Sequence, residues 1–107
     1  MPVTIQAEER TLTALLEGEI DHHTAKAMRE EIDSAAVRME PKLLRLDFSR
    51  VGFMDSSGIG LIMGRFRLMK ESGGSVEVIN VPIGMAKMMR LAGLGRLGIK
   101  GIERKRG

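Results

Sequence analysis

The segment GFMDSSGIG, residues 52–60, places two adjacent serines between an aspartate and two spaced glycines. A serine in this setting can act as a nucleophile, cap a helix, or accept a phosphate from another enzyme. Serine hydrolases hold their nucleophile within G-x-S-x-G, and neither Ser56 nor Ser57 has a glycine two residues before it. The histidines available as a base are His22 and His23. A hydrolase is therefore disfavoured, because the motif itself is missing.

Capping and phosphorylation both remain open for the serine motif. Asp55, Ser56 or Ser57 can each accept a hydrogen bond from a free N–H group in the first turn of a following helix. One cap uses one residue and leaves the other two polar side chains unexplained. A kinase can reach a serine at an exposed helix N-terminus, where the helix dipole and free N–H groups also favour the phosphate. The added charge of about −1.5 to −2 can abolish binding at a docking surface.

Residues near the motif in sequence offer contacts to a partner, and each also has a structural explanation. Glu19 and Asp21 bracket Ile20, so in an extended segment their carboxylates point the same way. They can bind a basic residue of a partner, or serve as a helix cap and a solvated acid. Leu61 and Leu68 lie off the expected inward stripe of their helix, and they either offer partly exposed apolar contacts or touch another helix of the domain.

Two glycines and two histidines complete the set of candidate residues. Gly60 and Gly64 lie four residues apart, and glycine costs up to about 1 kcal/mol in a helix interior. We therefore expect the sheet or a partner to approach the backbone closely there. His22 and His23 are adjacent, so on a helix they point about 100° apart and are unsuited to share a metal ion. We expect no metal site and no cofactor.

The elements that must position these residues follow from hydrophobic periodicity. Segment 3–7, a turn at 8–10 and segment 11–18 predict a hairpin. Residues 23–39 show helical periodicity, with Asp21 as N-cap and Pro41 as the stop. Residues 43–48 alternate as a buried strand, and a second helix is expected over 57–71. The expected inward residues of the two helices are Ala25, Met28, Ile32, Ala35, Ala36, Met39, Ile59, Ile62, Met63, Phe66 and Met69.

The rest of the chain predicts one more strand and helix. Residues 75–81 form a strand, Pro82 can start a helix through 93 because proline is tolerated at a first helical position, and residues 97–102 suggest a short last strand. The order ββαβαβα(β) indicates an α/β protein with a mixed sheet, antiparallel at the hairpin and parallel across the helical crossovers. A length of 107 residues indicates a single domain.

Composition excludes several classes of function. The chain has no cysteine, which excludes disulfides, zinc–thiolate sites and cysteine nucleophiles. It shows no bilayer-spanning apolar run and no secretory leader, so we expect a cytoplasmic protein without a membrane partner. The net charge of +3 equals that of residues 100–107 alone, which we expect to form a mobile basic tail. Three phenylalanines are the only aromatic residues, so we expect no direct nucleic-acid binding.

Two stretches resemble a known family. GEIDHHTA, residues 18–25, and FMDSSGIGLIMGR, residues 53–65, are similar to the anti-sigma factor antagonists of the STAS domain family. The D-H-H-T-A residues point to the sporulation branch, which acts on sigma-F. The likeness covers nearly all of residues 3–100 and implies a single STAS domain with helices packed on a mixed sheet. Family members usually continue into a C-terminal helix, for which the final GIERKRG is short.

The resemblance implies a binding protein that is not an enzyme. In its unphosphorylated form such a protein binds an anti-sigma factor that is also a serine kinase, and the sigma factor is released. The kinase phosphorylates the first serine of the D-S-S-G turn, which is Ser56 here, and a phosphatase reverses the modification. The residues expected to contact the partner are Glu19, Asp21, Asp55, Ser57, Gly58 and Leu61.

Three alternatives remain. A close one is an antagonist of a stress-response anti-sigma factor, which shares the serine turn. A second is a small serine hydrolase that uses Ser56, and a third is an adaptor that is never phosphorylated. Binding to each class of anti-sigma kinase, labelling by a fluorophosphonate probe, and phosphosite mapping distinguish them.

Overall fold

A four-stranded mixed sheet forms the centre of the molecule. The computed structural model describes residues 2–102. The elements are β1 (Val3–Glu8), β2 (Thr11–Ile20), α1 (His22–Met39), β3 (Leu43–Met54), α2 (Ser56–Glu71), β4 (Ser75–Ile79), α3 (Ile83–Leu91) and the 3-10 helix η1 (Leu94–Leu97). The strand order is β1-β2-β3-β4, with β1 antiparallel to β2 and the other pairs parallel. The predicted α/β class and mixed sheet are therefore confirmed.

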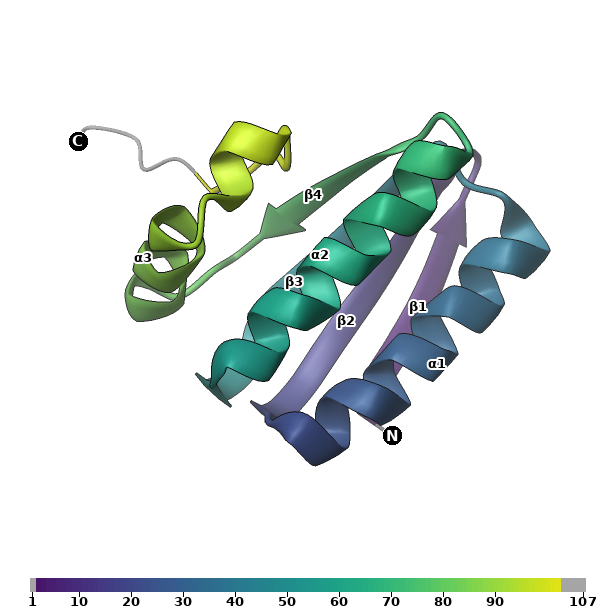
Figure 1. The fold of residues 1–107 in the computed structure, drawn as a ribbon. Helices are drawn as coiled ribbons and strands as arrows, with labels where there is room; N and C mark the ends of the chain where they lie inside the picture. Colours follow the sequence, from purple (N-terminus) through teal and green to yellow (C-terminus); the bar gives the residue numbers. More distant parts are fainter. Residues whose placement is uncertain (1, 103–107) are drawn as a thin grey trace.

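Helices α1 and α2 cover the same face of the sheet (Figure 1). α1 packs on β1 and β2, and α2 packs on β3 and β4. Each helix connects two parallel neighbouring strands, so both crossovers return the chain to the same edge and both helices run in the same direction. Their N-termini consequently lie side by side. α3 and η1 lie beyond β4, at the left in Figure 1.

The core follows the predicted periodicities closely. Leu44, Leu46 and Phe48 are fully buried, as expected for strand β3. The inward stripe of α1 is confirmed for Met28, Ile32, Ala35 and Ala36, which are buried, and for Ala25, which packs against the core. The stripe of α2 is confirmed for Ile62 and Met69, and its other three members are partly buried against the core. Met39 is exposed, so its assignment to the stripe is wrong.

The exposure of Met39 follows from the way α1 ends. Met39 is the last helical residue, and Glu40 follows it in the left-handed conformation with φ 51°. The chain then turns to enter β3, which carries the end of α1 away from the sheet. Pro41 stands after this cap, as the sequence predicts.

A second buried face of α2 decides between the two alternatives left open for Leu61. Leu61 is only 4% exposed, so the expectation that its side chain is partly exposed is wrong. The alternative, contact within the domain, applies because α1 packs beside α2. Arg65, one turn further along, is also buried, with Nε 2.7 Å from Asp33 Oδ1 of α1. Leu68 is partly buried against the core.

The expected last strand over residues 97–102 is also wrong. Residues 94–97 form η1, and only Lys100 pairs with the edge of the sheet, as a bridge to Glu77. Lys100 N donates to Val76 O at 3.1 Å, and Val78 N donates to Lys100 O at 2.9 Å. Lys100 therefore belongs to the fold and not to a tail. The rest of the expected tail, residues 103–107, lies outside the described residues.

Gly101 explains why this segment can lie so close to β4. Its φ is +92°, and a Cβ atom there would overlap Val78 O. A residue with a side chain would be strained by the dihedral and would push the segment off the sheet edge. The β4 edge is thereby covered by residues of the same chain.

Candidate functional site

Two aspartates are brought together where β2 and β3 end. Ile20 and Met54 are register partners at the ends of these parallel strands, and each is followed by the aspartate that caps the next helix. Asp55 N donates to Ile20 O at 3.1 Å, which ties the two connections to one another. The carboxyl ends of parallel strands are a common place for binding sites in α/β proteins. Asp21 and Asp55 therefore lie at one edge of the molecule.

Asp55 is the N-cap of α2, so the Ser56 side chain is not needed for capping. Asp55 Oδ1 accepts a hydrogen bond from Ser57 N at 2.8 Å. Ser56 is the first helical residue and is exposed. Across residues 2–102, no hydrogen bond involves Ser56 Oγ. The structure thus assigns the cap, one of the two interpretations of the motif, to the aspartate and places the Ser56 hydroxyl in solvent.

Asp21 caps α1, so its structural role is confirmed. Its Oδ1 accepts from His23 N and Thr24 N, both at 2.9 Å, and Thr24 Oγ1 accepts from Asp21 N at 2.9 Å. The hydrogen bond from Thr24 N is the main cause that lowers the pKa of Asp21 below its usual value. The carboxylate is ionised at neutral pH and half-exposed, so it can still meet a basic group.

Glu19 lies beside an exposed phenylalanine that the sequence analysis missed. Its register partner on β3 is Phe53, which is 51% exposed. The pairing of β2 with β3 shifts around Gly18, whose φ is +96°, and residues 17–19 are exposed in succession. This irregularity turns the end of β2 outward. The alternation along β3 breaks after Phe48, where Ser49 and Arg50 are both exposed, so no periodic pattern in the sequence places Phe53 on the surface.

Gly58 has a packing role beneath the first turn of α2. It is buried, and a Cβ atom there would overlap the Met54 side chain. The missing side chain lets the start of α2 settle on the end of β3. This contact fixes the height of Ser56 and Ser57 above the sheet. The predicted role of Gly58 in partner binding stays a prediction.

Gly60 and Gly64 do not make the expected contact with the sheet. Among residues 2–102, nothing lies within 4 Å of a Cβ atom built at either position. Both instead line a groove of about 830 Å³ between α1 and α2, so that part of the expectation is wrong and approach by a partner stays open. The other residues lining the groove are His22, His23, Ala25, Lys26, Ala27, Arg29, Glu30, Ser57, Leu61 and Arg65.

The groove gathers histidines and Ser57 without forming a catalytic arrangement. Within the described part of the chain, no hydrogen bond joins His22 or His23 to either serine. The same residues contain no group of three or more histidine, aspartate or glutamate side chains able to hold a metal ion.

Among the described residues 2–102, no helix is both long and apolar enough to cross a membrane.

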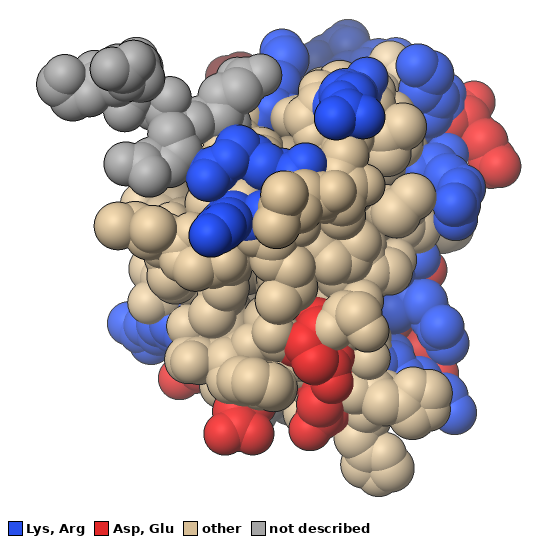
Figure 2. All heavy atoms as spheres, turned by 60° about the vertical axis from the view of Figure 1, so that its left-hand side comes forward, with Lys and Arg blue, Asp and Glu red and all other residues tan. Residues whose placement is uncertain are grey.

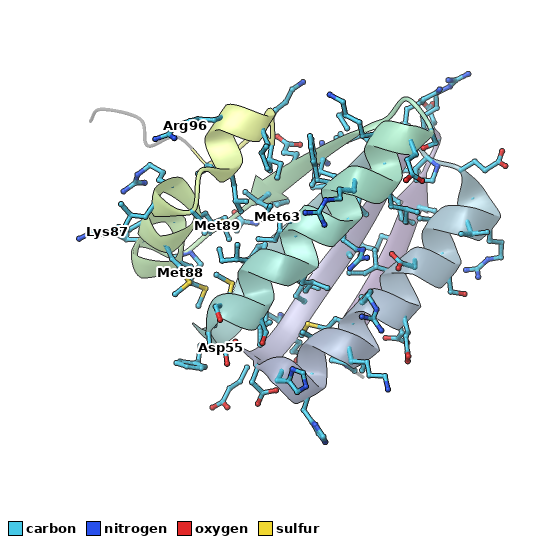
Figure 3. The ribbon with its side chains drawn as sticks, in the orientation of Figure 1. Asp55, Met63, Lys87, Met88, Met89 and Arg96 are labelled. Carbon is cyan, nitrogen blue, oxygen red and sulfur yellow. The ribbon has the colours of Figure 1, made fainter. Side chains whose placement is uncertain are left out.

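Methionines fill the space between α2 and α3. Figure 3 shows Met63 and Met89 directed toward one another, with Met88 nearer the end that carries Asp55. Met89 is fully buried, and Met63 and Met88 pack partly buried against the core. Core filling therefore accounts for these methionines of α2 and α3. Met88 keeps some exposed surface.

Comparison with known proteins finds a matching family model and related sequences. Residues 3–100 match the family model described as "Mlab, STAS domain". The chain is 31% identical over 97 residues to the anti-sigma F factor antagonist of Paenibacillus polymyxa, covering 91% of this chain and 83% of the relative. It is 29% identical over 92 residues to the anti-sigma-B factor antagonist of Bacillus subtilis (strain 168), covering 86% and 83%.

Two solved structures also match this chain over most of its length. The anti-sigma factor antagonist SpoIIAA in its unphosphorylated form matches with a TM-score of 0.78 and 32% identity, over 88% of this chain and 83% of that chain. The Bacillus cell fate determinant SpoIIAA in the phosphorylated form matches with a TM-score of 0.72 and 32% identity, over 88% and 86%.

Proposed function

The chain belongs to the STAS domain family, as its match over residues 3–100 and its antagonist relatives show, and we propose that it is an anti-sigma factor antagonist. In this proposal the unphosphorylated protein binds an anti-sigma factor that is also a serine kinase, and the bound sigma factor is released. Phosphorylation of Ser56 ends the interaction, and a phosphatase restores it. The protein acts in the cytoplasm by binding and not by catalysis.

The observation that carries the proposal is the position of the Ser56 hydroxyl. It is exposed at the start of α2, while Asp55 performs the capping. Its hydroxyl can therefore be modified without loss of a hydrogen bond that holds the fold. The N-terminus of a 16-residue helix also favours the phosphate that results. Phosphorylation then changes the surface and leaves the structure intact.

The surroundings of Ser56 favour a basic partner. Glu19, Asp21 and Asp55 lie at the edge where β2 and β3 end, and acidic side chains gather toward the lower part of the face in Figure 2. Phe53 adds an exposed apolar group on the same edge. A partner with lysine or arginine around an apolar pocket complements this surface. Ser57, Gly58 and Leu61 form or support the same end of α2.

The switch follows from the size and hydration of a phosphate at this edge. A phosphate on Ser56 brings a charge of about −1.5 to −2 close to the carboxylate of Asp55. It also adds a strongly hydrated group to a surface that must lose water when a partner docks. A partner packed closely against the start of α2 would have to remove this water and make room for the group, which opposes binding. The helix N-terminus offsets the repulsion between the phosphate and Asp55 within the folded protein, so the fold is retained.

We assign the chain to the sigma-F type. The D-H-H-T-A residues that follow β2 and the identity of 31–33% to two anti-sigma F factor antagonists support this assignment. The identities to anti-sigma-B factor antagonists are 27–29%, so that type is the second candidate. Calorimetric titration of this protein with one anti-sigma kinase of each class separates the two. Tighter binding to the sigma-B class would overturn the assignment.

Phosphosite mapping tests the role of Ser56. The wild type, Ser56→Ala and Ser57→Ala are incubated with the anti-sigma kinase and ATP, and the phosphate is located by mass spectrometry. We expect label on Ser56 in the wild type and in Ser57→Ala, and none in Ser56→Ala. Circular dichroism verifies that both variants are folded. Labelling of Ser56→Ala at the wild-type level, with none on Ser57→Ala, would place the site on Ser57 instead.

A further inference from the structure

The C-terminal part of the chain is strongly basic, in contrast to the rest. Residues 78–102 contain four basic residues and no aspartate or glutamate. Residues 103–107 add three basic residues and one glutamate, so residues 78–107 carry a net charge of +6. Since the whole chain carries +3, residues 1–77 carry −3. The positive charge is therefore concentrated on one end of the sequence.

The fold presents this charge on the side formed by α3 and η1. Lys87, Arg96 and Lys100 are exposed, and Figure 3 shows Lys87 and Arg96 directed away from the sheet. On the face in Figure 2, several basic side chains lie in the upper part, others lie at the right and lower left, and a group of acidic side chains lies lower down. We call the three exposed basic residues and the aliphatic residues among them the α3–η1 surface.

The aliphatic residues of the α3–η1 surface are unusually exposed. Ile83 and Leu91 of α3 are 70% and 80% exposed, and Leu97 of η1 is 41% exposed. Ile83, Lys87 and Leu91 follow one another at intervals of four residues, which places a cation between two aliphatic side chains on one side of α3. These three aliphatic side chains contribute little to the core, and their exposure therefore indicates a surface that contacts a partner.

The proposed anti-sigma partner does not suit this surface. That partner is expected to carry basic groups opposite Glu19 and Asp21, so Lys87, Arg96 and Lys100 would repel it. The α3–η1 surface therefore calls for an anionic partner of its own. Nucleic acid would use the charge but not the exposed aliphatic side chains, and the described residues of this surface include no aromatic side chain for base stacking.

We propose that the α3–η1 surface binds reversibly to an anionic phospholipid membrane. Basic residues attract the negative surface of a bilayer, and isoleucine and leucine side chains enter its interfacial region. α3 and η1 lie at one end of the molecule, and a bilayer surface can contact them without having a complementary shape. The expectation of no membrane partner rested on the absence of a spanning segment, and contact with a surface needs none. The acidic part of the molecule then faces away from the bilayer.

Vesicle binding tests the proposal with the full-length protein. Sedimentation is measured with vesicles of pure phosphatidylcholine and with equimolar phosphatidylcholine and phosphatidylglycerol, at low and at physiological salt. We expect binding to the anionic vesicles only, weakened by salt. Removing one basic residue should weaken binding about fivefold, so the triple variant Lys87→Gln/Arg96→Gln/Lys100→Gln should weaken it about 100-fold. The control Lys26→Gln/Arg38→Gln/Arg67→Gln removes three exposed charges from α1 and α2 and should lose much less.

A second pair of variants separates a membrane from other anions. Ile83→Ser/Leu91→Ser should weaken binding to anionic vesicles severalfold, with unchanged thermal stability because both side chains are exposed. The same variant should leave the weaker binding to duplex DNA or polyglutamate unchanged. Equal binding to both kinds of vesicle, equal losses in the two triple variants, or no effect of the serine substitutions would overturn the proposal. Tighter binding to DNA or polyglutamate than to anionic vesicles at the same salt would assign the surface to that polyanion instead.

Discussion

The buried charge of Arg65 should make Asp33 one of the most sensitive polar positions in the protein. Arg65 Nε lies 2.7 Å from Asp33 Oδ1, and the attraction between the two charges is the main interaction of the pair. Burial lowers the pKa of Arg65, and the charge of Asp33 counteracts that effect, while Arg29 adds repulsion. Leu61 O, at 3.3 Å from Nη1, is the other partner of the guanidinium. The pair joins α1 to α2.

The expected loss of stability for Asp33→Asn follows from these contacts. Removing one partner of a buried ion pair costs about 3–5 kcal/mol, because the remaining charge is left without compensation. The Asp33 side chain is 33% exposed and the Arg65 side chain 7%, so solvent screens the aspartate but hardly reaches the arginine. We therefore expect a loss of about 2–4 kcal/mol, which corresponds to a fall in Tm of about 10–20 °C for a domain of this size.

Urea unfolding followed by circular dichroism measures this loss. The matched control is Asp33→Asn combined with Arg65→Met, which removes the unpaired charge and should recover most of the stability. The m-value should be the same in all three proteins if the fold is retained. A loss below about 0.5 kcal/mol in Asp33→Asn would show that water or another group already neutralises Arg65, and the argument for a buried pair would fail.

Four further substitutions test separate parts of the structure. Asp21→Asn should keep the cap of α1, because asparagine also caps helices, and weaken binding of the anti-sigma partner in a salt-dependent manner; unchanged binding with a lowered Tm would make the residue purely structural. Burial would raise the pKa of Asp47, but hydrogen bonds from Ser49 N and Asn80 Nδ2 lower it overall. The ionised carboxylate of Asp47 therefore stabilises the fold above the unfolded pKa of about 4, and this stabilisation is lost as pH falls through the lower folded pKa. Asp47→Asn should accordingly flatten the fall in stability below pH of about 4, and an unchanged slope in urea titrations would refute this. Gly101→Ala should destabilise the protein by about 1–3 kcal/mol through its positive φ and the overlap with Val78 O, whereas Gly60→Ala, where space is open, should be neutral or stabilising.

Local sequence signals predicted most of the fold. Alternation placed Leu44, Leu46 and Phe48 in the core, and capping chemistry placed Asp21 at the start of α1. Such features depend on residues that are neighbours in the chain, so a periodicity or a cap preference is sufficient to predict them. The serine turn was placed correctly at the start of α2 for the same reason, although the sequence could not decide which of three residues performs the capping.

Features that depend on distant contacts were missed. The burial of Leu61 requires α1 to pack beside α2, and the pattern within α2 left partial exposure and contact within the domain equally open. The pairing of Lys100 with the β4 edge requires only one residue and leaves no strand-like alternation in the sequence. The outward turn of β2 depends on the register with β3 near Gly18. Each feature depends on the contact between two elements, and the pattern within one segment does not predict it.

The measurement that tests the proposed switch most directly is the affinity of the anti-sigma kinase for the two forms of this protein. Unmodified protein and protein phosphorylated on Ser56 are titrated with the kinase by calorimetry, in one buffer and at one salt concentration. Circular dichroism and Tm should be nearly the same for both forms, because the phosphate lies at the N-terminus of α2. We predict binding of the unmodified protein and a loss of at least about 100-fold, or about 2.7 kcal/mol, on phosphorylation. Equal affinity of the two forms would contradict the account.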